Sequence, residues 1–357
     1  MSKGLTNKKI MIYFDNQTIL KQKQLKVITT YLEGIMVGKI KGTGSYRPVQ
    51  VWDNDKLSRM MDTSDEWIRG RTGIGQRHIA SSGETVAYMA ARAAEEALSD
   101  AGMRPEEIDL LLVSTMSSER IMPCAACEVQ KLIGAVNAAS FDLNGACTGF
   151  LLALNTAQAY LGQQIYRRAL VIGSETLSHL TNWKDRSTCV LFGDGAGAVV
   201  LEAEENAVYI QAAHSIGSRG EALTCVSRNQ QEFIEKDADI SSTYMQMDGK
   251  EVFKFAVSKV PEVIMEVLEK AGKTKEEIRF YMLHQANKRI VASVSKHMNE
   301  PLEKYPMNIE NLGNTSSASI PLLLDEWNKK GRLNSGDWII LSGFGGGLTY
   351  GASLLQW

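Results

Sequence analysis

The chain has 357 residues, of which 44% are hydrophobic, and its formal net charge is −2. This composition is typical of a globular protein with two domains or one duplicated unit, and it provides no basic field for nucleic acid. No apolar run approaches the roughly 20 residues that a membrane span needs, and five cysteines are an odd count that argues against a disulfide framework. We therefore expect a cytoplasmic protein with reduced thiols that binds neither nucleic acid nor a membrane.

Residues 1–35 differ from the rest of the chain. They are rich in Lys, Gln and Asn, with scattered apolar residues, and they lack the apolar core and cleavage site of a signal peptide. At Met36 the sequence changes to "MVGKIKGTGSYRP", a strand and turn of the kind that opens a domain. We predict that residues 1–35 are an N-terminal extension, either native or the product of an upstream start codon.

The chain contains an internal repeat. Residues 93–114 ("AAEEALSDAGMRPEEIDLLLVS") and 264–284 ("IMEVLEKAGKTKEEIRFYMLH") each contain a helix ending in Ala-Gly, a polar turn with Glu-Glu-Ile, and an apolar strand. The offset of 170 residues matches Gly102 with Gly272 and, carried further, Cys147 with Ser317. A second repeat at an offset of 150 pairs residues 191–201 with 342–355, both interpreted as strand, Gly-rich turn and strand.

Alternating strands and helices indicate an α/β fold. Buried strands are predicted at 138–144, 168–175, 279–285 and 337–343, and helices at 148–164 and 250–272. We expect two duplicated α/β halves, residues 36–206 and 207–357, whose helices pack between and around two sheets.

Cys147 lies in "DLNGACTGF" between a predicted strand and a predicted helix. A lone cysteine is more often a buried filler than a nucleophile, but the start of a helix favours a thiolate, which attacks thioesters well. The repeat brings the second half's His284 and Asn314 toward the same place, where an imidazole NH and an amide NH₂ can stabilise an enolate. Glycines in "GFGGGLT" allow a backbone amide to approach a reacting carbonyl and, with the Cys147 amide, to form an oxyanion hole.

Other motifs favour structural interpretations. "CAAC" at 124–127 has zinc or redox spacing but no second pair, so we expect small buried thiols in a helix that starts after a proline. "GDGAG" lacks the spacing of a dinucleotide fingerprint. Asp194 beside it is expected to cap nearby amides, and we predict no metal site.

Six blocks in this order resemble a β-ketoacyl-acyl-carrier-protein synthase III of the thiolase-like superfamily. They are "TSDEWIRGRTGIGQRHIA", "DLNGACTGF", "FGDGAGA", "HQANKRI", "NLGNTSSASIP" and "GFGGGLTYG", and the resemblance covers residues 36–357. It implies a thiolase-like fold with a layered αβαβα arrangement, and a homodimer. It also implies that an acyl-CoA primer condenses with malonyl-acyl-carrier protein, initiating fatty-acid synthesis without a cofactor beyond the substrate's coenzyme A.

The resemblance also implies roles for individual residues. Cys147 would accept the acyl group, His284 and Asn314 would stabilise the carbanion, and the amides of Gly346 and Cys147 would form the oxyanion hole. The coenzyme A and pantetheine site would comprise Thr63, Trp67, Arg71, Arg186, Lys250, Phe253, Asn287 and Phe344, and the carrier protein would dock on Lys254 and Arg289.

The residue types alone leave other interpretations open for several of these binding roles. Trp67 and Arg71 are four residues apart on one helical face and suit stacking on a base, although a surface tryptophan can also cover the edge of a core. Lys254 and Arg289 can equally belong to a solvated face. Lys250 departs from the family, which often has Asn at this position.

Substrate choice depends on Met122, which stands where the family often has an aromatic residue that closes the acyl pocket across the dimer. Because methionine is flexible, we expect primers longer or bulkier than acetyl. The alternatives are a related acyltransferase or condensing enzyme of specialised, polyketide-type metabolism, and an acyl-binding protein with a dead site. No cysteine follows Cys225, which argues against a thiolase with its second catalytic cysteine.

Overall fold

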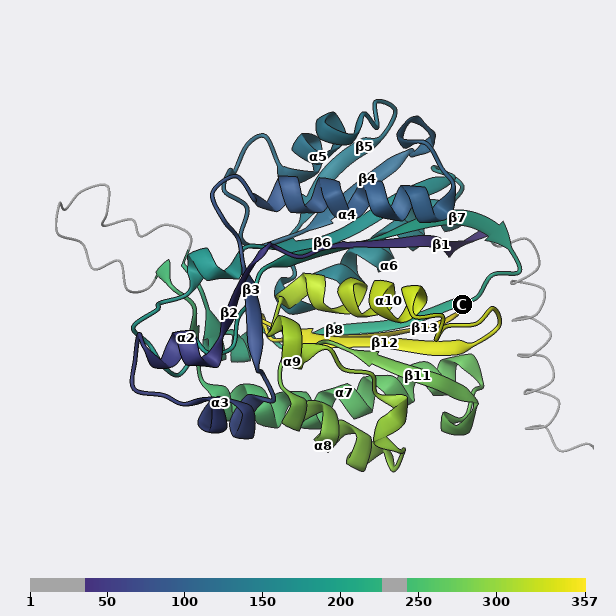
Figure 1. Ribbon diagram of the computed structural model, residues 1–357. Helices are drawn as coiled ribbons and strands as arrows, with labels where there is room; N and C mark the ends of the chain where they lie inside the picture. Colours follow the sequence, from purple (N-terminus) through teal and green to yellow (C-terminus); the bar gives the residue numbers. More distant parts are fainter. Residues whose placement is uncertain (1–35, 227–242) are drawn as a thin grey trace, which may run out of the picture. The chain divides into compact units, whose positions relative to one another are not determined.

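The computed structural model describes residues 36–226 and 243–357, so the predicted extension at 1–35 lies outside the described residues. Two main sheets organise the described part (Figure 1). The first sheet has the spatial order β1 (Met36–Tyr46), β7 (Gly195–Glu205), β6 (Arg168–Glu175), β4 (Leu110–Ser114) and β5 (Ala139–Leu143). The second has the order β11 (Ile278–Leu283), β12 (Trp338–Gly345), β13 (Thr349–Gln356) and β8 (Tyr209–Ser215).

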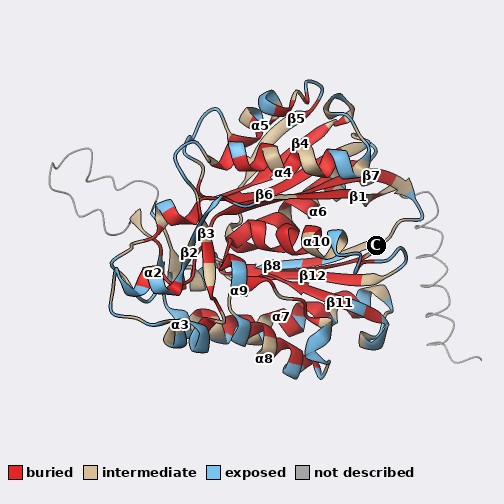
Figure 2. Ribbon diagram, in the orientation of Figure 1, coloured by how far each residue is buried: buried red, intermediate tan, exposed pale blue. Residues whose placement is uncertain are grey.

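Helices form three layers with the two sheets between them (Figure 1). Helices α6 (Gly149–Gly162) and α10 (Ser319–Lys329) lie between the sheets, α4 (Val86–Ala101) and α5 (Ala125–Ile133) cover the first sheet, and α7 (Gly249–Ala271) and α8 (Lys288–Met298) cover the second. This is the predicted αβαβα arrangement. Figure 2 shows the sheets and the facing sides of these helices as buried.

The sequence pattern of each helix matches its layer. Helix α6 is apolar over much of its circumference and buries Phe150, Leu151 and Leu154, as expected for a helix between two sheets. Helix α4 has one apolar face, begins where the Thr85 side chain accepts from the Tyr88 amide, and ends before a left-handed glycine. Helix α7 is long, but among the described residues no helix is long and apolar enough to cross a membrane.

Shorter elements connect these layers and surround the site. They are the hairpin β2 (Gln50–Asp53) and β3 (Gln76–Ile79), the pair β9 (Leu223–Thr224) and β10 (Gln246–Met247), and the helices α2 (Asn54–Ser58), α3 (Asp65–Thr72) and α9 (Ile309–Leu312). Short 3₁₀ turns precede both central helices, at Ala146–Thr148 and Ser316–Ala318.

The repeat at an offset of 170 residues is confirmed in three dimensions. Strands β6 and β12 both lie at this offset, as do the first residues of α6 and α10. Ala146 and Ser316 are also equivalent, and their φ angles of 46° and 48° are nearly the same. The second repeat, at an offset of 150, is only partly right: it matches β7 with β13, which pair antiparallel with the equivalent strands β6 and β12, but no strand precedes β7 at residues 191–194.

The chain leaves the first sheet at Glu205 and enters the second at Tyr209. The predicted division at residue 206 falls between these strands. Both sheets pack on the same buried layer of α6 and α10, and residues 36–357 form one compact unit.

Candidate active site

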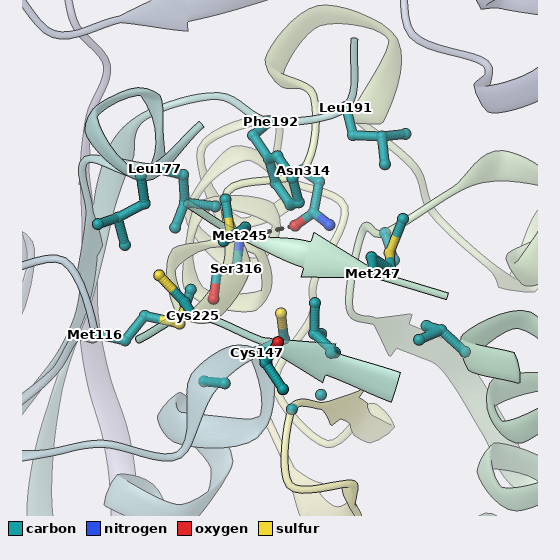
Figure 3. Close-up of a pocket in the computed structure, with 18 of the residues that line it drawn as sticks. Met116, Cys147, Leu177, Leu191, Phe192, Cys225, Met245, Met247, Asn314 and Ser316 are labelled. Carbon is teal, nitrogen blue, oxygen red and sulfur yellow. Dashed lines mark hydrogen bonds between the residues drawn. The ribbon is translucent and has the colours of Figure 1, made fainter. Parts of the chain in front are cut away.

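Cys147 occupies the turn between β5 and α6. The preceding residue, Ala146, is held at a positive φ of 46°, a backbone conformation that alanine rarely adopts. Cys147 is only 8% exposed, and it lines a cavity of about 1600 Å³ together with His284 and Asn314. Figure 3 shows Cys147 and Asn314 in this cavity. The structure therefore brings the three predicted catalytic residues to one pocket.

His284 follows the end of β11 and is fixed on both sides. Its amide donates to the Ser342 carbonyl at 2.8 Å, and its Nδ1 lies 2.6 Å from the Ser319 hydroxyl. That hydroxyl also accepts from the Gln285 amide at 3.4 Å. When it donates its own proton to Nδ1, the ring proton is on Nε2. Burial lowers the pKa of His284 to about 3, so the ring is a neutral donor and not a base.

Asn314 is oriented by three hydrogen bonds. Its amide donates to the Leu191 carbonyl at 2.8 Å, and its carbonyl accepts from the Gly193 amide at 3.0 Å. Its side-chain Oδ1 accepts from the Ser316 amide at 2.9 Å, the dashed line in Figure 3. Since Oδ1 is occupied, the Nδ2 group is the part of this side chain that can donate to a bound molecule.

The Gly-rich segment packs directly against Cys147. A Cβ atom at Gly345 would lie 2.8 Å from the Cys147 nitrogen and 3.0 Å from its Cβ, which no ordinary side chain allows. At Gly346 a Cβ would be 3.5 Å from Ala146, an ordinary contact. Glycine is therefore required at Gly345 for the close approach, and Gly346, the predicted oxyanion-hole residue, lies beside the nucleophile's turn.

The pKa of the Cys147 thiol shifts in the direction opposite to that expected for the start of a helix. Burial raises the pKa of the Cys147 thiol to about 11, and the negative charge of Glu175 acts in the same direction. The Ser316 hydroxyl opposes these effects. Burial and the start of α6 therefore act in opposite directions on the pKa of this thiol.

Trp67, part of the predicted coenzyme A site, lines the pocket. The guanidinium carbons of Arg71 and Arg186 each lie 4.9 Å from the centroid of its ring. Arg186 also donates to the Asp62 carbonyl at 2.6 Å, and Asn287 donates to the Arg71 carbonyl at 3.1 Å. A planar base would stack here by replacing one guanidinium.

Three basic side chains line the pocket near the start of α7 and α8. They are Lys250, Lys254 and Arg289, and within the part of the chain that the structure describes none of them pairs with an acidic side chain. Arg289 lies 5.8 Å from the ring of Phe253. Phe344 packs edge-on against His284 at 5.5 Å.

Two predicted site residues do not line this pocket. Thr63 is absent from the lining, and its hydroxyl is buried without a hydrogen-bond partner among the described residues. Met122 is also absent from the lining and is 85% exposed. Its proposed action across a dimer stays a prediction.

The sequence analysis missed much of the pocket wall. The additional side chains come from loops and short strands: Met116, Leu177, Leu191, Phe192, Cys225, Met245, Met247 and Ser316 (Figure 3). Three of them are methionines, which adapt to irregular ligands. Ser316 had a detectable signal, because it is the repeat equivalent of the residue before Cys147.

The structural interpretations are partly confirmed. Asp194 is a cap, since its carboxylate accepts from the amides of Ala80 and Ser178. The expectation of buried thiols in "CAAC" is wrong for Cys127, which is exposed, with its sulfur 3.4 Å from that of Cys124. Among the described residues no group of three or more His, Cys, Asp or Glu side chains is placed to hold a metal ion.

Comparisons with known proteins agree with this geometry. The family model for 3-oxoacyl-[acyl-carrier-protein (ACP)] synthase III matches residues 141–220, and the model of its C-terminal part matches residues 268–357. A β-ketoacyl-[acyl-carrier-protein] synthase III of Clostridium botulinum is 46% identical over 318 residues, which cover 88% of this chain and 97% of that protein. The homologue of Clostridium acetobutylicum is 45% identical over 320 residues, 89% of this chain and 98% of that protein.

Solved structures give the same result. The 3-oxoacyl-[acyl-carrier-protein] synthase III of Aquifex aeolicus superposes with a TM-score of 0.84 at 44% identity, covering 90% of this chain and all of that one. The priming β-ketosynthase of the R1128 polyketide pathway has a TM-score of 0.84 at 35% identity, covering 90% of this chain and 97% of that one. The chain belongs to the β-ketoacyl-acyl-carrier-protein synthase III family of condensing acyltransferases, with a thiolase-like fold.

Proposed function

We propose that this enzyme condenses an acyl-CoA primer with malonyl-acyl-carrier protein through an acyl-Cys147 intermediate, giving a β-ketoacyl-carrier protein. The observation that carries the proposal is the meeting of one thiol and two oriented neutral donors, His284 and Asn314, in one cavity. This set suits thioester exchange followed by decarboxylation to an enolate.

In the first half-reaction the Cys147 sulfur attacks the thioester carbonyl of the primer. The oxyanion that forms is expected to bind the amides of Cys147 and Gly346, and coenzyme A leaves as a thiolate. Trp67, Arg71 and Arg186 hold the adenine end at the mouth, while Lys250 and Phe253 face the pantetheine. Thr63 stays a weaker candidate, because its hydroxyl does not face the cavity.

In the second half-reaction malonyl-carrier protein enters the same cavity. Its thioester oxygen accepts from His284 Nε2 and Asn314 Nδ2, and loss of carbon dioxide leaves an enolate that attacks acyl-Cys147. Because both donors are neutral and oriented before substrate arrives, they favour the charge that develops in the transition state. The chemistry requires no metal ion and no cofactor beyond the coenzyme A of the primer.

The basic side chains at the rim suit an acidic carrier protein. We expect Lys254→Glu to raise KM for malonyl-carrier protein, most strongly at low salt, and to leave acylation of Cys147 by acyl-CoA nearly unchanged. An equal effect on both half-reactions would show that Lys254 does not belong to a docking surface.

The proposal includes a homodimer in the cytoplasm. Strand β5 is an edge strand of the first sheet, and large apolar side chains are exposed nearby, including Met122 at 85%, Val136 at 69% and Leu132 at 53%. A second copy paired along β5 would cover them. The odd number of cysteines, which argues against a disulfide framework, agrees with a reducing compartment.

Intact-mass measurement after incubation with acyl-CoAs of different chain lengths tests the proposed function. We expect one acyl adduct on the native enzyme, none on Cys147→Ala, and discharge of the adduct when malonyl-carrier protein is added. His284→Ala should acylate but fail to discharge. A native enzyme that no acyl-CoA modifies would overturn the proposal.

A role in priming polyketide synthesis is the second candidate. It is supported by the similarity to the R1128 priming synthase and by the methionine-rich wall of a cavity of about 1600 Å³. Equal discharge by fatty-acid and polyketide carrier proteins would leave the pathway open to both, whereas a strong preference for one carrier protein would assign it.

A further inference from the structure

A buried arginine binds the pocket wall and has no role in the mechanism described so far. Arg77 lies on β3 and is fully buried. Among the described residues no carboxylate forms an ion pair with its guanidinium, which is unusual for a buried arginine. Burial lowers the pKa of Arg77 to about 10, so the side chain stays charged at neutral pH, and neutral oxygens must compensate this charge.

Three such oxygens bind the guanidinium. Its Nη2 donates to the Val190 carbonyl at 2.9 Å. Its Nη1 donates to Asn54 Oδ1 at 2.9 Å and to the Trp52 carbonyl at 3.2 Å. Asn54 is fixed in turn, because its Nδ2 donates at 2.8 Å to Asp65, the first residue of α3. Since hydrogen bonds from a charged donor are stronger than those from a neutral one, Arg77 holds the Val190 carbonyl firmly.

Strand β3 fixes both ends of the segment 190–194. The Arg77 side chain holds its first residue, and the His78 carbonyl accepts from the amide of its last residue, Asp194, at 2.9 Å. Residues 190–192 of this segment line the cavity. The position of this part of the pocket wall therefore depends on two hydrogen bonds with one short strand.

Asn314 pairs with the middle of the same segment. Its amide donates to the Leu191 carbonyl at 2.8 Å, and its carbonyl accepts from the Gly193 amide at 3.0 Å. Both backbones pass close to Arg77, because a Cβ atom at Gly193 would lie 3.1 Å from the Arg77 Cβ and one at Gly313 would lie 3.3 Å from it. Arg77 therefore packs against the segment and against the turn that carries Asn314.

We propose that Arg77 is a positioning residue for the second half-reaction: it holds the segment 190–194 where this segment aims the Asn314 amide group at the malonyl thioester. The inference rests on the proposed function, because it assigns Asn314 to that step. The other donor, His284, is held separately by the Ser319 hydroxyl and the Ser342 carbonyl. Loss of the guanidinium should therefore misplace one of the two donors and leave the other in position.

The first half-reaction provides an internal comparison. Acylation uses the Cys147 sulfur and the backbone amides of Cys147 and Gly346, whereas Asn314 acts on the malonyl thioester. The three oxygens that bind Arg77 all lie outside the turn of Cys147. A change at Arg77 should therefore separate the two half-reactions.

Arg77→Met tests the proposal, because it keeps a long apolar side chain and removes every donor. Acylation of Cys147 by acyl-CoA, and discharge of the adduct by malonyl-carrier protein, are each followed by rapid quench and intact mass. We expect the acylation rate to stay within about threefold of the native rate and the discharge rate to fall by about 100-fold, the effect of misplacing a group by about 1 Å. Arg77→Lys keeps the charge but loses the planar fork, so discharge should fall by about tenfold. It carries the test if Arg77→Met does not fold.

A double-mutant comparison identifies the residue through which Arg77 acts. Discharge by Asn314→Ala is expected to be slow, and adding Arg77→Met should slow it by less than about threefold, because the misplaced amide is already absent. Thr43→Val is the matched control for loss of a buried hydrogen bond. The Thr43 hydroxyl donates to Asp325 at 2.9 Å, and neither residue lines the cavity. Both of its rates should stay near the native values.

Three results would overturn the positioning role. Unchanged discharge in both Arg77 variants would show that the guanidinium does not orient Asn314. An equal fall in acylation and discharge, or a separation of the two rates in Thr43→Val as well, would show that Arg77 only stabilises the fold. A further fall of about 100-fold when Arg77→Met is added to Asn314→Ala would show that it acts through another group. A native enzyme that no acyl-CoA modifies would instead contradict the proposed function, so the two failures are distinguishable.

Discussion

Replacing Gly345 by alanine is the sharpest test of how Cys147 is positioned. The new Cβ would lie 2.8 Å from the Cys147 nitrogen and 3.0 Å from its Cβ, whereas an ordinary contact needs about 3.4 Å or more. The obstacle is the backbone and Cβ of Cys147 and the backbone nitrogen of Thr148, so this turn must move by about half an ångström. Overpacking of this kind costs about 1–3 kcal/mol of stability, and misplacement of a reacting group can cost about 100-fold in rate, or about 2.7 kcal/mol.

We therefore expect Gly345→Ala to remain folded with a lower Tm and to lose about 100-fold in the rate of Cys147 acylation, measured by rapid quench and intact mass. Gly343→Ala is the matched control on the same strand, since its Cβ would meet Leu151 at 3.4 Å and His284 at 3.6 Å, both ordinary contacts. An acylation rate in Gly345→Ala equal to that of Gly343→Ala would refute the reasoning from this contact.

Three further predictions concern the histidine, the coenzyme A site and the primer. Burial lowers the pKa of His284 from 6.5 to about 3, so as the pH falls the unfolded chain binds this proton before the folded chain does. The free energy of unfolding should therefore decrease as the pH falls from about 6.5 toward 3. Acid titration followed by circular dichroism should show a smaller decrease in His284→Gln. Trp67→Ala should raise KM for acyl-CoA by about tenfold, because stacking of a base on an aromatic ring is worth about 1–3 kcal/mol. It should leave KM for an acyl-pantetheine substrate unaffected. An equal change for both substrates would show that the adenine base does not stack on Trp67. Met122→Phe should reduce turnover of long acyl-CoA far more than of acetyl-CoA, and an equal reduction in a chain-length series would contradict its role in the acyl pocket.

The sequence was sufficient for the layers and for three residues that meet in one pocket, Cys147, His284 and Asn314, because each stands in a recognisable local pattern. The strand at 168–175 was predicted with the same bounds as β6, and the Gly102 and Gly272 repeat located two equivalent helix ends. The pocket wall was not predictable in this way. Met116, Met245 and Cys225 lie on segments without strong periodicity, and they converge only because the two halves pack together.

The pKa values of buried side chains were also not predictable from the sequence. Helix position suggested a thiolate at Cys147, but the sequence does not reveal that the sulfur is nearly enclosed and that burial raises the pKa of its thiol. In the same way nothing in "RALVIGSE" distinguishes Glu175 from an exposed strand-end carboxylate. Its burial and its contacts with Ser317 and Ser117 exist only in the folded chain.

The duplication explains how two similar halves came to hold different functional groups. At the offset of 170 residues Ser114 corresponds to His284 and Gly149 to Ser319. In one half a Cβ at Gly149 would lie 2.1 Å from the Ser114 hydroxyl, and in the other the Ser319 hydroxyl orients the His284 ring at 2.6 Å. These equivalent positions therefore hold two small residues, Ser114 and Gly149, in one half and a hydrogen-bonded pair, His284 and Ser319, in the other.

A second set of equivalent positions follows the same logic. Glu175 corresponds to Gly345, and Cys147 corresponds to Ser317. Glu175 reaches across to Ser317 with a hydrogen bond of 2.7 Å, while Gly345 leaves room for Cys147, whose nitrogen a Cβ would approach to 2.8 Å. A carboxylate at Gly345 would fill the space of the nucleophile, and a glycine at Glu175 would remove the acid behind it. The asymmetry of these two positions therefore leaves room for the Cys147 sulfur beside one turn and places a buried acid against the other.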